Sequence, residues 1–252
     1  MNNKHIKYIF TDLDGTLGRE ELGIPDKNRK MIKEFVTRGG KFGICTGRAP
    51  GSASGFMQDI PINTISVVNG GCALYNFQTG QLQDELFVSE GAFQYAIEAQ
   101  KKIEKYVKCN LIVVNRDGYW PCTAENADRI LRPWYRIIFQ VSPEYAMDIA
   151  KEVQEQKPDN VRIESSAPDF VEIMHISAGK YNALKKICGY LEISPEQMAF
   201  IGDFYNDMES FQLVGVSACV GNAPEEVKRH CNYILGDCME GAVGDFLQKF
   251  QY

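Results

Sequence analysis

The sequence predicts an α/β protein, with a Rossmann-like parallel sheet core that is interrupted by an inserted α+β domain. Apolar runs alternate with helical stretches over residues 1–80, and the same alternation resumes over residues 178–252. Between them, residues 81–177 contain strands that follow one another without a helix in between. Strands that alternate with helices are typical of parallel sheets, whereas consecutive strands are typical of antiparallel ones. We therefore expect one discontinuous core and one insertion.

The first segment is predicted to contain strand, helix, strand and strand in that order. Residues 8–11, 42–45 and 65–68 are short apolar runs, and each is followed by polar or glycine residues. Such runs predict buried strands. Residues 26–38 have apolar side chains at helical spacing, with Asp26 placed to cap the start and two glycines after the end. These signals predict a helix between the first two strands.

The middle segment is predicted to run helix, two strands, helix, two strands. The turn signal Asn-Arg-Asp-Gly at residues 115–118 indicates a hairpin. The helices are expected at residues 92–106 and 144–155, and the strands at residues 110–114, 119–123, 136–141, 161–165 and 170–176.

The third segment returns to the α/β pattern. Apolar runs that end in glycine predict buried strands, and apolar residues at helical spacing predict the helices between them. The strands are expected at residues 198–201 and 216–220, and the helices at residues 180–191, 206–213, 224–229 and 242–250.

Composition excludes several classes of protein. The chain has 252 residues and a net charge of -6, from 27 basic and 33 acidic residues, and it has no long basic run. Proteins that bind nucleic acids usually carry a basic surface, so this balance argues against such a partner. No apolar stretch approaches the roughly 18 residues of a membrane-spanning helix, which argues against a membrane protein.

The eight cysteines are expected to be reduced thiols. None forms a Cys-x-x-Cys pair, and several lie inside apolar runs. No export signal is visible at the start of the sequence, so the cytoplasm is the expected compartment. Cysteines in that compartment are usually kept reduced.

Acidic residues follow two of the predicted core strands. Asp12 and Asp14 come directly after the first strand, and Asp203 and Asp207 follow the strand at residues 198–201. The carboxyl ends of parallel strands meet at one edge of a sheet, so these carboxylates are expected to lie together. Neighbouring carboxylates raise one another's pKa unless a cation intervenes, and Mg2+ prefers oxygen ligands. The sequence therefore predicts a magnesium site at this edge.

The first pair of acids also suits phosphoryl transfer. A carboxylate nucleophile divides hydrolysis into two steps, and Asp12 is placed for that role. Asp14 can protonate the leaving oxygen and later deprotonate water. Thr46 and Gly47 can offer a hydroxyl and backbone N–H groups to a phosphate, and a bound anion would favour Lys180 in the first turn of its helix.

Each feature alone also has a purely structural interpretation. The acids near Gly15 can form an ordinary turn, and so can Thr46 with Gly47. Lys180 can be a solvated surface lysine. Asp203 or Asn206 can cap the helix that follows. The chemical interpretation depends on the occurrence of all these features in one chain and in this order.

With these pieces in order, the chain resembles the haloacid dehalogenase-like (HAD) hydrolases, and within them the Cof-type phosphatase branch with a large C2-type cap. The resemblance covers nearly the whole chain. It rests on these segments: Asp12-Leu13-Asp14-Gly15-Thr16-Leu17, Thr46-Gly47-Arg48, Asn69-Gly70, Lys180, Gly202-Asp203 through Asn206-Asp207, and Gly221-Asn222-Ala223. Tyr181 departs from the branch, which often has glycine at that position.

The resemblance implies a role for each residue of these segments. Asp12 would be the nucleophile and Asp14 the general acid and base. Mg2+ would be held by the Asp12 carboxylate, the Asp14 main-chain carbonyl and Asp203. The remaining roles would be support of the metal by Asp207, and binding of the phosphoryl group by Thr46 with Gly47, Lys180 and Asn206.

The leading prediction is a Mg2+-dependent phosphomonoester phosphatase of small phosphorylated metabolites, with sugar phosphates as a candidate class, that acts through an aspartyl-phosphate. Two alternatives stay open: a phosphotransferase or phosphomutase with the same nucleophile, and a non-enzymatic Mg2+-binding phospho-receiver. Specificity is expected to reside in the cap. Trp120, Trp134, Tyr135 and Arg136 are candidates there, although aromatic residues in such domains mostly pack. The sequence makes no prediction of the oligomeric state.

Overall fold

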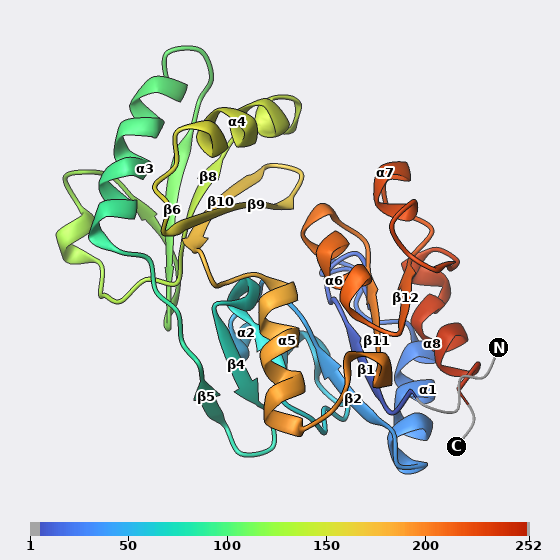
Figure 1. Cartoon of the computed structure of the whole chain (residues 1–252). Coiled ribbons are helices and arrows are strands. Elements are labelled where there is room, and N and C mark those ends of the chain that lie inside the picture. The colour runs from blue at the N-terminus through green and yellow to red at the C-terminus, as the bar shows by residue number, and fades with distance from the viewer. Residues whose placement is uncertain (1–5, 251–252) are drawn as a thin grey trace. The chain divides into compact units, whose positions relative to one another are not determined.

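The structure is a computed structural model that describes residues 6–250 (Figure 1). The chain divides into two compact units. The first, which we call the core unit, consists of Met1–Gln83 and Lys180–Tyr252. The second, which we call the insert unit, consists of Asp84–Gly179.

The core unit is built on a five-stranded parallel sheet with the order β13-β12-β11-β1-β2. This confirms the predicted α/β class. The central strand β1 pairs with β11 on one side and with β2 on the other, so residues from both ends of the chain meet at its end. The strands are β1 (Tyr8–Thr11), β2 (Lys41–Ile44), β11 (Met198–Gly202), β12 (Val216–Cys219) and β13 (Tyr233–Ile234).

Helices cover both faces of this sheet (Figure 1). Successive side chains of a strand point to opposite faces, and the strands are apolar on both. Ile9 packs in one cluster with α1 (Asp26–Thr37) and α8 (Ala242–Leu247). Its neighbour Phe10 packs in another with α5 (Lys180–Leu191) and α6 (Met208–Leu213). The sheet is therefore buried on both faces. The ends of its strands are the part that remains available for a functional site.

Shorter elements complete the core unit. A three-stranded antiparallel sheet has the order β3-β4-β5, and Val67 of β3 forms a bridge to Cys45, which follows β2. These elements are α2 (Pro50–Met57), β3 (Ser66–Val68), η2 (Asn69–Gly71), β4 (Ala73–Asn76), β5 (Gln81–Gln83), η4 (Pro195–Gln197), η5 (Tyr205–Asp207), α7 (Glu225–Lys228) and η6 (Cys238–Glu240).

The insert unit is a five-stranded antiparallel sheet, in the order β7-β6-β8-β10-β9, with two helices. Three strands follow its first helix, in agreement with the predicted strand ranges, whereas the predicted order with only two strands there was wrong. The elements are α3 (Glu90–Ile103), β6 (Asn110–Asn115), β7 (Gly118–Cys122), η3 (Ala127–Arg129), β8 (Arg136–Gln140), α4 (Pro143–Glu155), β9 (Val161–Ala167) and β10 (Phe170–His175).

The two faces of the insert sheet differ in chemistry. Ile137 and Phe139 of β8 pack with apolar residues of α3 and α4. Arg136, which alternates with them, points to the other face, where its guanidinium lies 2.6 and 2.7 Å from the two carboxylate oxygens of Glu172. Both side chains are 1% exposed. This pair is a fully buried, charge-neutral contact.

Local signals were partly misassigned from the sequence. Pro25 is the N-cap residue of α1, and Asp26 lies in the first turn without a capping hydrogen bond, so Asp26 is not the cap. The predicted hairpin does form between β6 and β7, and the side chain of Asn115 accepts hydrogen bonds from the N–H groups of Asp117 and Gly118. Trp134 is buried against Phe93, with ring centroids 5.0 Å apart, so this aromatic side chain packs in the core of the insert unit.

Candidate active site

The site begins where β1 and β11 end side by side. Thr11 pairs with Ile201 in the parallel ladder, and the N–H of Asp12 donates a hydrogen bond of 2.8 Å to the carbonyl of Ile201. The next residues, Asp12 and Asp203, are therefore delivered to the same edge of the sheet. Asp12 is 8% exposed, so its carboxylate is almost entirely removed from water.

A buried lysine joins two of the acids. The Nζ atom of Lys180 lies 3.0 Å from Oδ1 of Asp12 and 2.7 Å from Oδ1 of Asp207. Lys180 is 2% exposed although it is the first residue of α5. Two nearby carboxylates compensate the unfavourable position of a cation at a helix N-terminus. Lys180 is thus a buried cation and not a solvated surface residue.

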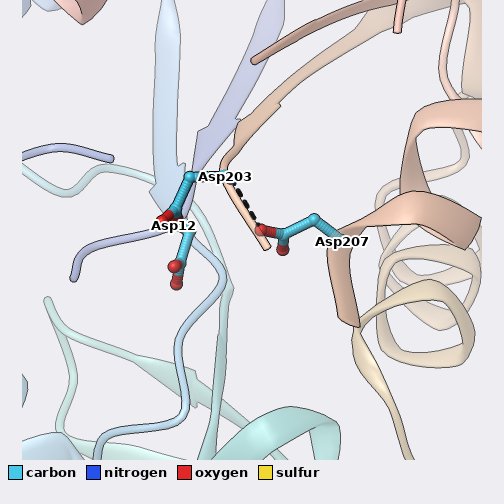
Figure 2. Close-up of side chains that lie close together, drawn as sticks. All are labelled: Asp12, Asp203 and Asp207. Atoms are coloured by element: carbon cyan, nitrogen blue, oxygen red, sulfur yellow. Dashed lines mark hydrogen bonds between the residues drawn. The ribbon is translucent and has the colours of Figure 1, made fainter. Parts of the chain in front are cut away.

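Asp207 is held by hydrogen bonds on both oxygens. Its Oδ2 accepts from the N–H of Asp203 at 2.9 Å (Figure 2). The same oxygen accepts from the N–H of Phe204 at 3.1 Å, and Oδ1 accepts from Lys180. Gly202 leaves room for this carboxylate, because a Cβ there would lie 2.4 Å from Oδ2 of Asp207. Asp207 therefore fixes the loop after β11, and neither Asp203 nor Asn206 is the cap considered from the sequence.

Asp203 is tied to the loop that follows β1. The hydroxyl of Thr16 donates to Oδ1 of Asp203 at 2.6 Å, so Thr16 reaches a residue far outside its own loop. Gly15 passes close to the same carboxylate with φ 80°, and a Cβ there would lie 2.4 Å from Oδ2 of Asp203. The side-chain amide of Asn222 donates to the Gly15 carbonyl at 2.8 Å. The two loops are thereby locked together.

Burial and mutual repulsion perturb the acids. Burial raises the pKa of Asp12 well above its usual value, and the charges of Asp207 and Asp203 add to the rise against the opposing charge of Lys180. Burial and the charge of Asp207 raise the pKa of Asp203 to about 7. Burial would lower the pKa of Lys180, but the carboxylates of Asp12 and Asp207 raise it well above its usual value. Lys180 therefore stays positively charged and forms an ion pair with both Asp12 and Asp207.

The donor set fits a hard divalent cation. Asp12, Asp203 and Asp207 each offer a carboxylate oxygen, and these oxygens lie within 4.8 Å of one another (Figure 2). Three carboxylates with a single nearby ammonium leave an excess of negative charge in a buried place. Oxygen ligands suit Mg2+, and a cation there would relieve the repulsion that raises the two pKa values.

The side chain of Asp14 lies apart from these three carboxylates and pairs with Arg48. The guanidinium of Arg48 donates to both oxygens of Asp14, at 2.6 and 2.8 Å, and also to Glu20 at 2.9 Å and to Ser52 at 3.1 Å. It also lies 4.7 Å from the ring centroid of Phe56. A bidentate pair of this kind fixes both partners in orientation.

The remaining predicted residues lie in neighbouring loops of the core unit. Thr46 is fully buried; its hydroxyl accepts from the N–H of Arg48, and its carbonyl accepts from the N–H of Gly70. Gly47 lies between Thr46 and Arg48 in this turn. Asn206 has a buried side-chain oxygen for which the structure shows no hydrogen-bond partner. Buried polar atoms usually have a partner, so this oxygen is a candidate contact for a ligand.

Two side chains were missed as site residues by the sequence analysis. Arg48 and Asn222 both stand in segments that carried the resemblance, but no role was assigned to either of them. Arg48 contacts Asp14, and Asn222 supports Gly15. Their position inside the motifs was the available signal, whereas their partners are distant in sequence.

Comparison with known proteins identifies the family. A family model described as haloacid dehalogenase-like hydrolase matches residues 9–132 and 117–247. The chain belongs to this family. The predicted HAD resemblance and its Cof-type branch are thereby confirmed, and the chain is a HAD-type hydrolase.

Named relatives of this HAD hydrolase include phosphatases. A 5-amino-6-(5-phospho-D-ribitylamino)uracil phosphatase of Bacillus subtilis is 25% identical over 254 residues, covering 97% of this chain and 96% of the relative. Phosphoglycolate phosphatase 1 of Saccharolobus solfataricus is 37% identical over 249 residues, covering 97% and 95%. These names support the phosphatase activity predicted from the sequence.

Solved structures share the fold. A haloacid dehalogenase-like hydrolase from B. subtilis matches with a TM-score of 0.83 at 18% identity, covering 98% of this chain and 100% of that one. Another from Bacteroides thetaiotaomicron matches with a TM-score of 0.78 at 18% identity, covering 97% and 99%. Among the described residues, no helix is both long and apolar enough to cross a membrane.

Proposed function

We propose that the protein is a Mg2+-dependent phosphatase that hydrolyses small phosphorylated metabolites through an aspartyl-phosphate on Asp12. The observation that carries the proposal is the environment of Asp12. One of its oxygens lies 3.0 Å from Lys180, and its carboxylate shares a buried, oxygen-only cluster with Asp203 and Asp207. A nucleophile held by a cation beside a candidate metal site is suited to attack a phosphate anion.

The chain's own residues can account for both half-reactions. In the first, a carboxylate oxygen of Asp12 forms a bond to phosphorus while the bond to the leaving oxygen breaks, and Asp14 gives that oxygen a proton. In the second, Asp14 takes a proton from water, the water oxygen bonds to phosphorus, and the Asp12 carboxylate leaves with inorganic phosphate as the other product. In this scheme the pair between Asp14 and Arg48 opens during turnover.

The neighbouring groups would position the phosphoryl group and the metal. Asp12 and Asp203, with the Asp14 main-chain carbonyl, would hold Mg2+, and Asp207 would support this shell while it holds Lys180. When bound, the cation supplies positive charge that offsets the charge of the phosphoryl group. Thr46, Gly47, Lys180 and Asn206 would contact the phosphoryl oxygens. The contact from Asn206 would come from its Nδ2 group, which is a donor, because its orphaned Oδ1 can only accept a hydrogen bond.

The substrate class is proposed from the relatives and from the two-unit architecture. The relatives in B. subtilis and S. solfataricus are named for small phosphate esters. We assign the insert unit, Asp84–Gly179, as the cap that recognises the leaving group. Sugar phosphates are the first class to test, and the cytoplasm is the proposed compartment.

The proposal is tested by phosphate release from a panel of phosphorylated metabolites, with and without Mg2+. We expect Asp12→Asn to lower kcat by at least about a thousandfold, because it removes the nucleophile. Asp59→Asn, which changes an exposed acid of the core unit, is the matched control and should retain wild-type activity. Acid-quenched wild-type enzyme should carry one phosphoryl group on Asp12.

Other outcomes would select the alternatives. Transfer of the phosphoryl group to a second hydroxyl without release of phosphate would indicate a phosphomutase. Phosphorylation of Asp12 without any turnover would indicate a receiver. Activity of Asp12→Asn close to that of the wild type would contradict the mechanism.

A further inference from the structure

Two thiols lie in contact at an edge of the core sheet, outside the candidate active site. Cys219 is the last residue of β12, and Cys231 lies between α7 and β13. Their sulfur atoms are 3.1 Å apart. This is closer than the roughly 3.5–4.0 Å at which non-bonded heavy atoms usually rest. The two residues are therefore already placed for a reaction with each other.

Backbone hydrogen bonds hold the segments that carry the two thiols next to each other. β12 and β13 run in parallel, with Ala218 opposite Tyr233. Hydrogen bonds of 3.1 Å from Asn232 to Ser217 and of 2.8 Å from Leu235 to Cys219 hold the two segments side by side. In this register Cys219 lies opposite Ile234, and Cys231 precedes Ile234 by three residues, in the segment that leads into β13. A shift of about 1 Å in sulfur position would bring the pair to bonding distance.

Accessibility distinguishes the two partners. The described residues include all eight cysteines, and every one is a free thiol. Seven are buried, whereas Cys231 is partly exposed. An oxidant from solvent would therefore reach Cys231 first, with buried Cys219 directly behind it.

The electrostatic environment points the same way. The hydrogen-bonded contact with Cys219 lowers the pKa of Cys231 to about 7, while the same contact and burial raise the pKa of Cys219. By contrast, burial raises the pKa of Cys109 to about 12. The thiolate is the reactive form of cysteine, so Cys231 is the more nucleophilic of the pair near neutral pH.

We propose that Cys219 and Cys231 are a peroxide-reactive pair that forms a reversible intramolecular disulfide. The Cys231 sulfur attacks one oxygen of a hydroperoxide, the O–O bond breaks, and the other oxygen leaves as water or an alcohol. The Cys219 thiol then loses its proton and attacks the Cys231 sulfenic acid, whose S–O bond breaks to release water. The two sulfurs supply the two electrons that reduce the peroxide.

The link would form beside a segment that supports the active-site loops. Asn222 follows Cys219 by three residues, donates to the Gly15 carbonyl and accepts from the N–H of Cys238. The proposed modification does not depend on the phosphatase mechanism, since it requires the two thiols and an oxidant alone.

The test exposes the full-length protein to hydrogen peroxide, then counts free thiols after unfolding and maps linked peptides by mass spectrometry. We expect wild type to lose two of its eight thiols, with one linked peptide pair that contains Cys219 and Cys231. Dithiothreitol should restore both thiols. Cys231→Ser should lose none at the same dose, while Cys109→Ser, a change at a buried cysteine of the insert unit, should behave as wild type.

A second variant tests whether Cys231 is oxidised before the disulfide forms. Cys219→Ala should stop at the sulfenic acid, so a dimedone adduct should accumulate on Cys231 and no linked peptide should form. A different cysteine pair in wild type, equal thiol loss in Cys231→Ser, or oxidation of Cys231 beyond the sulfenic acid without a link would overturn the proposal.

Discussion

Within residues 6–250, each unit buries one cation, and the surroundings of these two cations differ. In the insert unit, Arg136 faces Glu172, whose carboxylate also accepts a hydrogen bond from Ser166, and the guanidinium donates to the hydroxyl of Tyr119 at 2.9 Å. In the core unit, Lys180 faces Asp12 and Asp207, and Asp203 lies within the same cluster of acids. One site is balanced in charge, and the other has more acids than cations.

The difference separates structural from chemical use of buried charge. A balanced, hydrogen-bonded pair has no need of a further ion, and with Tyr119 and Ser166 it links four strands of the sheet, β7, β8, β9 and β10. An unbalanced cluster raises the pKa values of its own members and is stable only with protons or with an added cation. Perturbed groups of this kind are characteristic of functional sites.

Of the substitutions at the two buried cations, Lys180→Met in the core unit should have the larger effect. The substitution removes the cation that holds Asp12 and Asp207, so kcat for phosphate release should fall by about 100- to 1,000-fold. Lys185→Met, on an exposed position of the same helix, is the control. A kcat within about twofold of wild type for Lys180→Met would remove Lys180 from the machinery.

Arg136→Met should instead reduce stability. It leaves the buried carboxylate of Glu172 without its cation, at a cost of about 3–5 kcal/mol. Both tryptophans, Trp120 and Trp134, lie in the insert unit, so denaturation followed by tryptophan fluorescence reports on this unit directly.

A double substitution tests whether the unpaired charge causes this loss of stability. The double substitution of Arg136 and Glu172 by Met should recover most of the lost stability, because no unpaired charge remains. Arg129→Met, at an exposed position of the same unit, should change little. If the double variant is no more stable than Arg136→Met, the pair is not the source of the effect.

The smallest expected effect is a pH dependence of the stability of the core unit when no metal is bound. A carboxyl group whose pKa is raised in the folded state favours folding below its unfolded pKa and loses that contribution as pH rises through the folded value. The pKa of Asp203 is raised to about 7, and that of Asp12 is also raised, so stability in EDTA should fall by roughly 1–3 kcal/mol between about pH 5 and 8.

Circular dichroism of the whole chain checks this fall, and tryptophan fluorescence gives the insert unit as an internal reference. Mg2+ should suppress the fall, and Asp203→Asn should reduce it. An equal fall in the insert unit, or stability that rises over this range, would contradict the assignment.

Local sequence patterns predicted most of the fold. The helix at Lys180–Leu191 and the strands of the parallel sheet follow from apolar periodicity and from glycine at their ends. The helix at Pro50–Met57 was missed because its Gly-Ser-Ala-Ser-Gly stretch has low helix propensity. The strands Ala73–Asn76, Gln81–Gln83 and Tyr233–Ile234 were too short to give a periodic signal.

The candidate site was less predictable than the fold. The rule that parallel strands end at one edge predicted that Asp12 and Asp203 meet. It could not predict which partner a side chain chooses. Thr16 donates a hydrogen bond to Asp203 in a loop distant in sequence, and Asp14 pairs with Arg48. Such choices depend on packing between distant segments, which periodicity does not encode.

The pairing of β1 with β11 also has a consequence for biosynthesis. β1 leaves the ribosome roughly 190 residues before its neighbour β11, which begins at Met198. At about 5–20 residues per second, this edge of an apolar strand waits some 10 to 40 seconds for its partner. The insert unit is complete before then and can fold while the core is still open. The nascent protein is thus expected to mature from its middle outward, and its active site to be assembled last.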